Sequence, residues 1–218
     1  MSIAPAPLAS TARLLRFDLV QRAAHWLTAT LFGVLMATAI PLYFGSFFGL
    51  VWPRHTVAMI HLWTGVALPV PVIVSLLGSW GRQMRRDVRR FNLWTRDEIR
   101  WLRSWGVTPL EADKFNPGQK LNAIFIGAAI VIMLATGAML QWFRFFPVTW
   151  RTGATFVHDA FALVIFVVVF GHIFMALTHR DALRSIFKGW VSESWAARHA
   201  GAWLKEVRAR ESVDADDR

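Results

Sequence analysis

The chain of 218 residues contains no cysteine. This absence excludes a disulfide scaffold, a thiolate zinc site, a cysteine-ligated iron–sulfur cluster and the C-x-x-C-H attachment of c-type haem. Any metal or cofactor must therefore be held by histidine or by oxygen ligands. Charged residues are also scarce, at 17%, whereas apolar residues reach 55%, which is too apolar for an ordinary soluble domain. The composition therefore predicts a membrane protein.

Four long apolar runs predict the fold. They lie at about 23–48, 56–80, 121–143 and 152–178, and Asp159 is the one formal charge within them. A helix of about 20 residues crosses the hydrocarbon core, so we expect an all-α membrane protein with a bundle of four transmembrane helices. The first run could instead be a signal peptide, because Ala37 and Ala39 resemble a cleavage site. Its continuation to Phe48 favours a span.

The basic residues predict the orientation of these spans. Of 24 lysines and arginines, 21 lie before the first run, in the connection at 81–120 or after residue 178. The two opposite connections hold only Arg54, Arg144 and Arg151. Because basic residues in short loops stay on the cytoplasmic side, we expect both termini to be cytoplasmic. The net charge of +10 is thus interpreted as a topology signal rather than as a nucleic-acid-binding surface.

The segments outside the spans have their own signals. Thr95-Arg96-Asp97-Glu98 has the spacing of a capping box, and the apolar residues after it recur at helical intervals. We expect a short interfacial helix here, between spans two and three, in contact with membrane lipid. Asn116-Pro117 predicts an N-cap followed by proline at the first helical position. Residues 1–12 are expected to be a flexible extension, 195–207 helical and 208–218 disordered.

Four of the seven histidines lie within the spans: His25, His61, His158 and His172. Ionisable groups inside a bilayer are costly and usually functional. His158 and His172 are fourteen residues apart, which puts them on roughly the same face of one helix, about 21 Å apart along its axis. The remaining three histidines, His55, His179 and His199, lie at span ends or in the tail.

The depths of these histidines predict two pairs. His61 and His158 each lie seven residues from a basic residue on the outer side, whereas His25 and His172 both lie near the cytoplasmic side. Two stacked imidazole pairs in a four-helix bundle are what two b-type haems require. Gly65 and Gly171 would allow a macrocycle or a neighbouring helix to approach closely. Structural histidines, a metal transporter or a proton relay are the alternatives, although a transporter would be expected to have more acidic partners.

Three motifs resemble one family. They are Ala112-Asp113-Lys114-Phe115-Asn116-Pro117-Gly118-Gln119-Lys120, the histidines fourteen apart, and Ser185-Ile186-Phe187-Lys188-Gly189-Trp190-Val191 with Trp195-Ala196-Ala197-Arg198-His199 after it. Together they resemble the gamma, or cytochrome b556, subunit of membrane-bound formate dehydrogenases over 13–207. The wider di-haem cytochrome b family, which includes nickel–iron hydrogenase and thiosulfate reductase anchors, shares the four-helix plan.

The resemblance implies a multi-pass subunit of the bacterial inner membrane that reduces quinone, with formate oxidation on another subunit. Electrons would come from an iron–sulfur beta subunit, which a molybdenum or tungsten alpha subunit supplies. The outer haem b would be bound by His61 and His158, and the inner haem b by His25 and His172. A higher oligomer of the heterotrimer is also implied.

The resemblance further implies a site for menaquinone or ubiquinone by the inner haem. Asn116 would donate a hydrogen bond to a quinone carbonyl, with Gly118 and Gln119 lining the site and His172 close by. The chain departs from the family pattern at His199-Ala200, where two adjacent histidines are common. Two alternatives remain: a cytochrome b subunit of another dehydrogenase, such as nickel–iron hydrogenase, or a haem-free membrane anchor or transporter.

Overall fold

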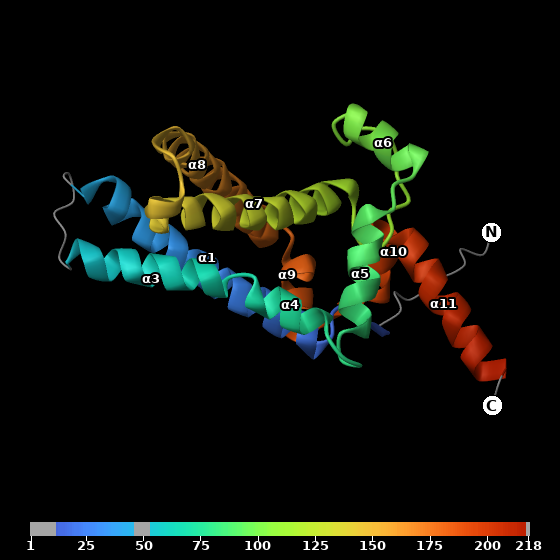
Figure 1. Cartoon of the computed structure of the whole chain (residues 1–218). Coiled ribbons are helices and arrows are strands. Elements are labelled where there is room, and N and C mark those ends of the chain that lie inside the picture. Colours follow the sequence, from blue (N-terminus) through green and yellow to red (C-terminus); the bar gives the residue numbers. More distant parts are fainter. Residues whose placement is uncertain (1–11, 46–52, 217–218) are drawn as a thin grey trace, which may run out of the picture. The chain divides into compact units, whose positions relative to one another are not determined.

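The computed structural model describes residues 12–45 and 53–216, and most of them are helical (Figure 1). The long helices are α1 (Leu19–Tyr43), α3 (Arg54–Ala67), α4 (Val70–Leu76), α7 (Pro117–Gln141) and α8 (Val148–Thr178). The shorter elements are β1 (Arg13–Leu15), α5 (Arg82–Asn92), α6 (Arg96–Arg103), η1 (Phe143–Phe145), α9 (Arg180–Lys188), β2 (Trp190–Ser192), α10 (Glu193–His199) and α11 (Gly201–Asp216).

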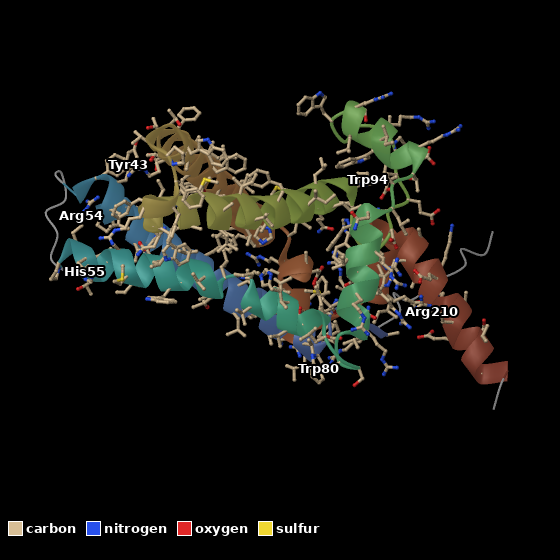
Figure 2. All side chains as sticks on the ribbon, viewed as in Figure 1. Tyr43, Arg54, His55, Trp80, Trp94 and Arg210 are labelled. Atoms are coloured by element: carbon tan, nitrogen blue, oxygen red, sulfur yellow. The ribbon has the colours of Figure 1, made fainter. Side chains whose placement is uncertain are left out.

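Within the described residues, four stretches of helix are long and apolar enough to cross a membrane, as the sequence predicts. They are Leu19–Tyr43, Arg54–Leu76, Pro117–Gln141 and Val148–Thr178. The first ends at Tyr43 rather than at Phe48, and residues 46–52 lie outside the described part of the chain. Tyr43, Arg54 and His55 lie where the first span ends and the second begins, and Trp80 follows the far end of the second span (Figure 2). There Arg54 Nη1 donates to the Leu42 carbonyl at 3.1 Å.

The second span is broken, which the apolar pattern does not predict. Helix α3 ends at Ala67 and α4 begins at Val70, on either side of Leu68 and Pro69. Pro69 has no N–H group to continue the α3 ladder, so the helix stops and restarts. Beyond α4, Arg85 Nη1 donates to the carbonyls of Leu76 at 2.6 Å and Gly78 at 2.9 Å. Arg85, in the basic helix α5, thus satisfies carbonyls at the end of α4.

The chain divides into two compact units. The bundle unit comprises Val20–Arg86 and Asn122–Met175, and the second unit comprises the described residues of Met1–Leu19, Asp87–Leu121 and Ala176–Arg218. Within the bundle unit, α1 runs alongside α3 (Figure 1), and α8 contacts α1, α3 and α7 through its two histidines. Helix α8 is therefore the element around which the candidate site is arranged.

The second unit has its own apolar core. Val191, Trp195, Ala196, Trp203 and Leu204 are buried together. Strand β1 pairs with β2 in antiparallel register over three residues, a sheet that the sequence does not predict. The capping box predicted at α6 is confirmed. The Thr95 side chain accepts a hydrogen bond from the Glu98 backbone N–H, and the Glu98 side chain accepts one from the Thr95 backbone N–H. The tail at 208–216, predicted to be disordered, instead continues α11 to Asp216. Residues 1–11 of the predicted flexible extension lie outside the described residues.

Candidate functional site

The structure brings the four histidines of the spans together in the two predicted combinations. The ring centroids of His61 on α3 and His158 on α8 are 6.4 Å apart. Those of His25 on α1 and His172 on α8 are 6.2 Å apart. Each pair therefore joins α8 to a different helix, and the two pairs lie at different depths along α8.

These separations fit a metal between the rings of each pair. Bonds between a metal and an imidazole nitrogen are about 2 Å long, so two imidazoles on opposite sides of one ion have centroids about 6 Å apart. Both observed separations agree with this value. Among the described residues, no group of three or more histidine, cysteine, aspartate or glutamate side chains could hold a metal ion. Two protein ligands suffice only where a macrocycle supplies the rest, as haem does.

Two threonines that the sequence pattern does not single out contact the rings of one pair. Thr38 Oγ1 on α1 lies 2.8 Å from His61 Nδ1, and Thr136 Oγ1 on α7 lies 2.9 Å from His158 Nδ1. Histidines that bind metals commonly use their second nitrogen in this way. Both contacts engage Nδ1, so Nε2 of each ring is left for a metal.

The glycines that the sequence singles out have different surroundings. A Cβ at Gly65 would meet Leu35 of α1 at 3.8 Å, so Gly65 packs between helices. A Cβ at Gly171 would meet nothing within 4 Å, so the backbone beside His172 faces open space. Gly137 was not predicted to matter, yet a Cβ there would lie 3.5 Å from the His158 ring. Its small size leaves room for that ring.

Arg151 has a buried polar atom that a ligand could satisfy. It precedes His158 by seven residues, two turns of α8, and therefore lies on nearly the same face. Its Nε is buried and has no hydrogen-bond partner among the described residues. Buried donors of this kind are normally paired, and haem carries two carboxylates. The donor set at this end of the bundle therefore fits haem rather than a bare ion.

The three other histidines are placed as predicted, outside the two pairs. His55 lies beside Arg54 at the start of α3 (Figure 2). His179 precedes α9, where its Nδ1 lies 3.0 Å from the Thr178 hydroxyl. His199 stacks on Trp195, with ring centroids 5.2 Å apart, and burial, assisted by the charge of Arg198, lowers its pKa below 6.5.

The residues predicted to bind quinone lie in both units. Asn116, Gly118 and Gln119 are adjacent at the start of α7 and belong to the second unit, whereas His172 belongs to the bundle unit. Asn116 Oδ1 accepts from Gln119 N at 2.9 Å, and Gln119 Oε1 accepts from Asn116 N at 3.1 Å. This reciprocal cap confirms the predicted start of the helix. This pair of hydrogen bonds does not involve the side-chain amide nitrogen of Asn116, Nδ2.

The two lysines of the same motif are buried in ion pairs of the second unit. Lys114 Nζ lies 2.5 Å from Asp87, and Lys120 Nζ lies 2.5 Å from Glu98. Arg16 is buried beside them and donates to the Lys114 carbonyl at 2.9 Å. Burial lowers the pKa of Arg16 to about 10, although the charge of Asp87 opposes this shift. These cations fix the segment that presents Asn116.

Comparison with known proteins identifies the family. The sequence model of prokaryotic cytochrome b561 matches residues 16–189, which includes all four paired histidines. The chain belongs to the prokaryotic cytochrome b561 family. It is therefore a multi-pass protein of the bacterial inner membrane that carries electrons through haem b.

Individual relatives of this cytochrome are named as formate dehydrogenase subunits. The chain is 27% identical to the formate dehydrogenase cytochrome b556 subunit of Haemophilus influenzae, over 91% of this chain and 85% of the relative. It is 27% identical to the cytochrome b556(fdo) subunit of Escherichia coli, over 89% and 93%. It is 21% identical to the nitrate-inducible cytochrome b556(Fdn) subunit of Escherichia coli, over 91% and 94%.

Proposed function

We propose that this cytochrome is the membrane subunit of a formate dehydrogenase, binds two b haems and delivers electrons to quinone. The names of its relatives support the choice of dehydrogenase. The observation that carries the proposal is the pairing on α8, where His158 and His172 each face a histidine of another helix at 6.4 and 6.2 Å. A single haem would use only one of these pairs as ligands, whereas two haems use both.

In this proposal His61 and His158 hold one haem, and His25 and His172 hold the other. A b haem with two histidine ligands changes between ferric and ferrous states and so takes and gives one electron at a time. The α8 segment between the two pairs, 160–171, consists only of apolar residues and glycine. It would exclude water and ions from the region between the centres, which lie about 21 Å apart along the helix.

Arg151 would supply a countercharge at the His61–His158 centre. Its buried Nε needs an acceptor, and a carboxylate of the macrocycle would provide one. A guanidinium suits this role because its planar donors match a carboxylate.

Asn116 would bind quinone through the amide nitrogen that the helix cap leaves unused. The cap fixes Oδ1 toward the α7 backbone, so the amide plane is held and Nδ2 can donate to a carbonyl. Gly118 and Gln119 are exposed beside it. His172, the fourth residue that the resemblance implies for quinone, belongs to the bundle unit.

The proposed direction of electron flow follows from the charges. With 21 of 24 basic residues on one side, we place both termini in the cytoplasm and the connection before Arg54 outside. The iron–sulfur partner would then dock at the end of the bundle that carries Arg54 and the His61–His158 pair. Quinone would take its protons from the cytoplasm at the opposite end, so turnover would generate a membrane potential.

A haem count and redox titrations test this function. We expect two haem b per chain by pyridine haemochrome assay and two components in an optical redox titration of the purified complex. His61→Ala or His158→Ala should remove one component, and His25→Ala or His172→Ala the other. His55→Ala is the matched control and should remove neither. A chain that purifies without haem, or loss of a component in His55→Ala, would contradict the ligand assignment.

The identity of the partner needs a separate measurement. Purification of the native complex should recover a formate-oxidising molybdenum or tungsten subunit and an iron–sulfur subunit. Recovery of hydrogenase subunits instead would keep the cytochrome b role and replace the dehydrogenase.

A further inference from the structure

The two histidine pairs differ in their hydrogen bonding. Both rings of the His61–His158 pair contact a threonine hydroxyl, at 2.8 and 2.9 Å. For the His25–His172 pair, no hydroxyl contact is found within the part of the chain that the structure describes. Thr28, one turn after His25, has a buried Oγ1 without a hydrogen-bond partner among these residues. Among the described residues, the His61–His158 pair therefore has two threonine hydroxyls in contact with its rings, and the His25–His172 pair has none.

The direction of the first hydrogen bond follows from the other contacts of Thr38. Its Oγ1 lies 2.8 Å from the Val34 carbonyl and 3.1 Å from the Leu35 carbonyl, and both oxygens can only accept. A hydroxyl has one hydrogen, which these carbonyls occupy. Toward His61, Thr38 can therefore only accept, so His61 Nδ1 must carry the proton. The tautomer is assigned by this network rather than by a visible hydrogen.

The second hydrogen bond repeats this arrangement on another pair of helices. Thr136 Oγ1 donates to the Ile132 carbonyl at 2.8 Å and lies 2.9 Å from His158 Nδ1. By the same argument Thr136 accepts and His158 Nδ1 donates. Each threonine lies on the helix that precedes its histidine, at a separation of 23 residues in one case and 22 in the other.

These contacts would act on a metal through the imidazoles. A hydrogen bond accepted from Nδ1–H fixes the ring and raises the basicity of Nε2. A more basic ligand stabilises the ferric state relative to the ferrous state, which lowers the reduction potential. Hydrogen bonding of the ligands is one of the means by which proteins set haem potentials.

We propose that Thr38 and Thr136 are positioning residues that lower the reduction potential of the His61–His158 haem relative to the His25–His172 haem. This inference rests on the proposed function, because it requires haem at both pairs. Electrons that enter at the His61–His158 end would then move toward the centre of higher potential. The two hydroxyls thus give the transfer its direction.

The test is an optical redox titration of the purified complex with Thr38→Val, Thr136→Val and the double variant. Valine keeps the shape of threonine and removes the acceptor. We expect the component that is missing in His61→Ala to shift to higher potential in each variant, and furthest in the double variant. The other component should not move. Electron paramagnetic resonance of the oxidised complex should show a changed signal for the same haem alone.

Matched controls separate the contact from the loss of a helix hydroxyl. Thr30 Oγ1 on α1 donates to the Trp26 carbonyl at 2.9 Å, and Thr155 Oγ1 on α8 donates to the Arg151 carbonyl at 3.0 Å. Thr30→Val and Thr155→Val remove the same i−4 bond without touching a histidine and should leave both potentials unchanged. Thr38→Ser and Thr136→Ser keep the hydroxyl and should restore the wild-type potential.

Several results would overturn the inference. For variants with full haem content, the inference is wrong if the potential is unchanged in the double variant. It is also wrong if both components shift equally, or if Thr30→Val causes an equal shift. If a valine variant loses haem, selective loss of that one component with recovery in the serine variant supports positioning, whereas loss of both components refutes it. Two haems that respond to the histidine variants but not to these threonines would leave the proposed function intact. A wild-type chain without haem would remove both.

Discussion

The buried Lys114–Asp87 pair allows a quantitative prediction. The Lys114 side chain is 0% exposed and that of Asp87 is 2% exposed, with Nζ and Oδ2 2.5 Å apart. Lys114→Ala leaves the Asp87 carboxylate buried without this partner. Breaking a buried pair in this way costs about 3–5 kcal/mol. We expect the lower end of that range, about 3 kcal/mol, because Arg90 Nε lies 3.9 Å from the other carboxylate oxygen.

This loss should be visible in thermal unfolding. For a chain of this length, 1 kcal/mol shifts the midpoint by about 2–4 °C, so Lys114→Ala should lower it by about 6–12 °C. Circular dichroism of the detergent-solubilised complex measures the midpoint. Hydrogen exchange of 112–120 should rise in the same variant, because these backbone groups are held by the buried cations of the second unit.

An exposed ion pair of the same unit is the matched control. Lys205 and Glu111 approach to 2.7 Å, but their side chains are 74% and 53% exposed. Exposed pairs contribute at most about 1 kcal/mol, so Lys205→Ala should shift the midpoint by no more than a few degrees. The double variant Asp87→Leu with Lys114→Met should recover only part of the loss, since neither charge of the pair stays buried but Arg16 loses the nearby charge of Asp87. Equal effects of Lys114→Ala and Lys205→Ala would refute the argument.

Three further predictions concern the haem, the quinone and pH. Asn116→Asp keeps the α7 cap but removes the Nδ2 donor, so quinone reduction by the complex should fall about 5- to 10-fold with haem content unchanged; unchanged rates would remove Asn116 from the site. Arg151→Leu removes a cation near the His61–His158 pair and should lower the potential of that component, whereas Arg144→Leu should not. Because the folded pKa of His199 lies below 6.5, the unfolded chain binds the proton more tightly and stability should fall as pH drops below 6.5. His199→Gln should show a smaller drop in unfolding midpoint over the same interval, and an identical drop would exclude this contribution.

The apolar bundle and its histidines could be predicted because a bilayer imposes simple rules. Runs of about 20 uncharged residues mark the spans, and basic residues such as Arg54 and Arg151 mark their ends. Counting residues from those ends put His61 level with His158, and the rings lie 6.4 Å apart. Depth is encoded linearly in the sequence of a helix, so neighbours at equal depth can be inferred without knowing how the helices pack.

The second unit could not be predicted in the same way. Strand β1 pairs with β2 across more than 170 residues of sequence, and Lys114 pairs with Asp87 across 27. Such contacts depend on how helices and loops meet outside the bilayer, where no depth rule applies. The polar composition of 208–218 suggested disorder, but Ala209 and the residues around it suit a helix once α11 is anchored by Trp203 and Leu204 in the apolar core.

Thr38 and Thr136 show why a site can be incomplete when histidines alone are counted. A threonine in a membrane helix satisfies itself by bonding the carbonyl four residues back, so its presence carries little information. Thr30 does this and nothing more, whereas Thr38 does it and also accepts from His61. A usable signal was nevertheless present, because each threonine lies one helix earlier and 22 or 23 residues before a histidine of the same pair. If residues are counted from the span ends for threonines as well as for histidines, Thr38 and Thr136 are found at the depth of the His61–His158 pair. The same count separates them from Thr30, which lies at the depth of neither histidine of that pair.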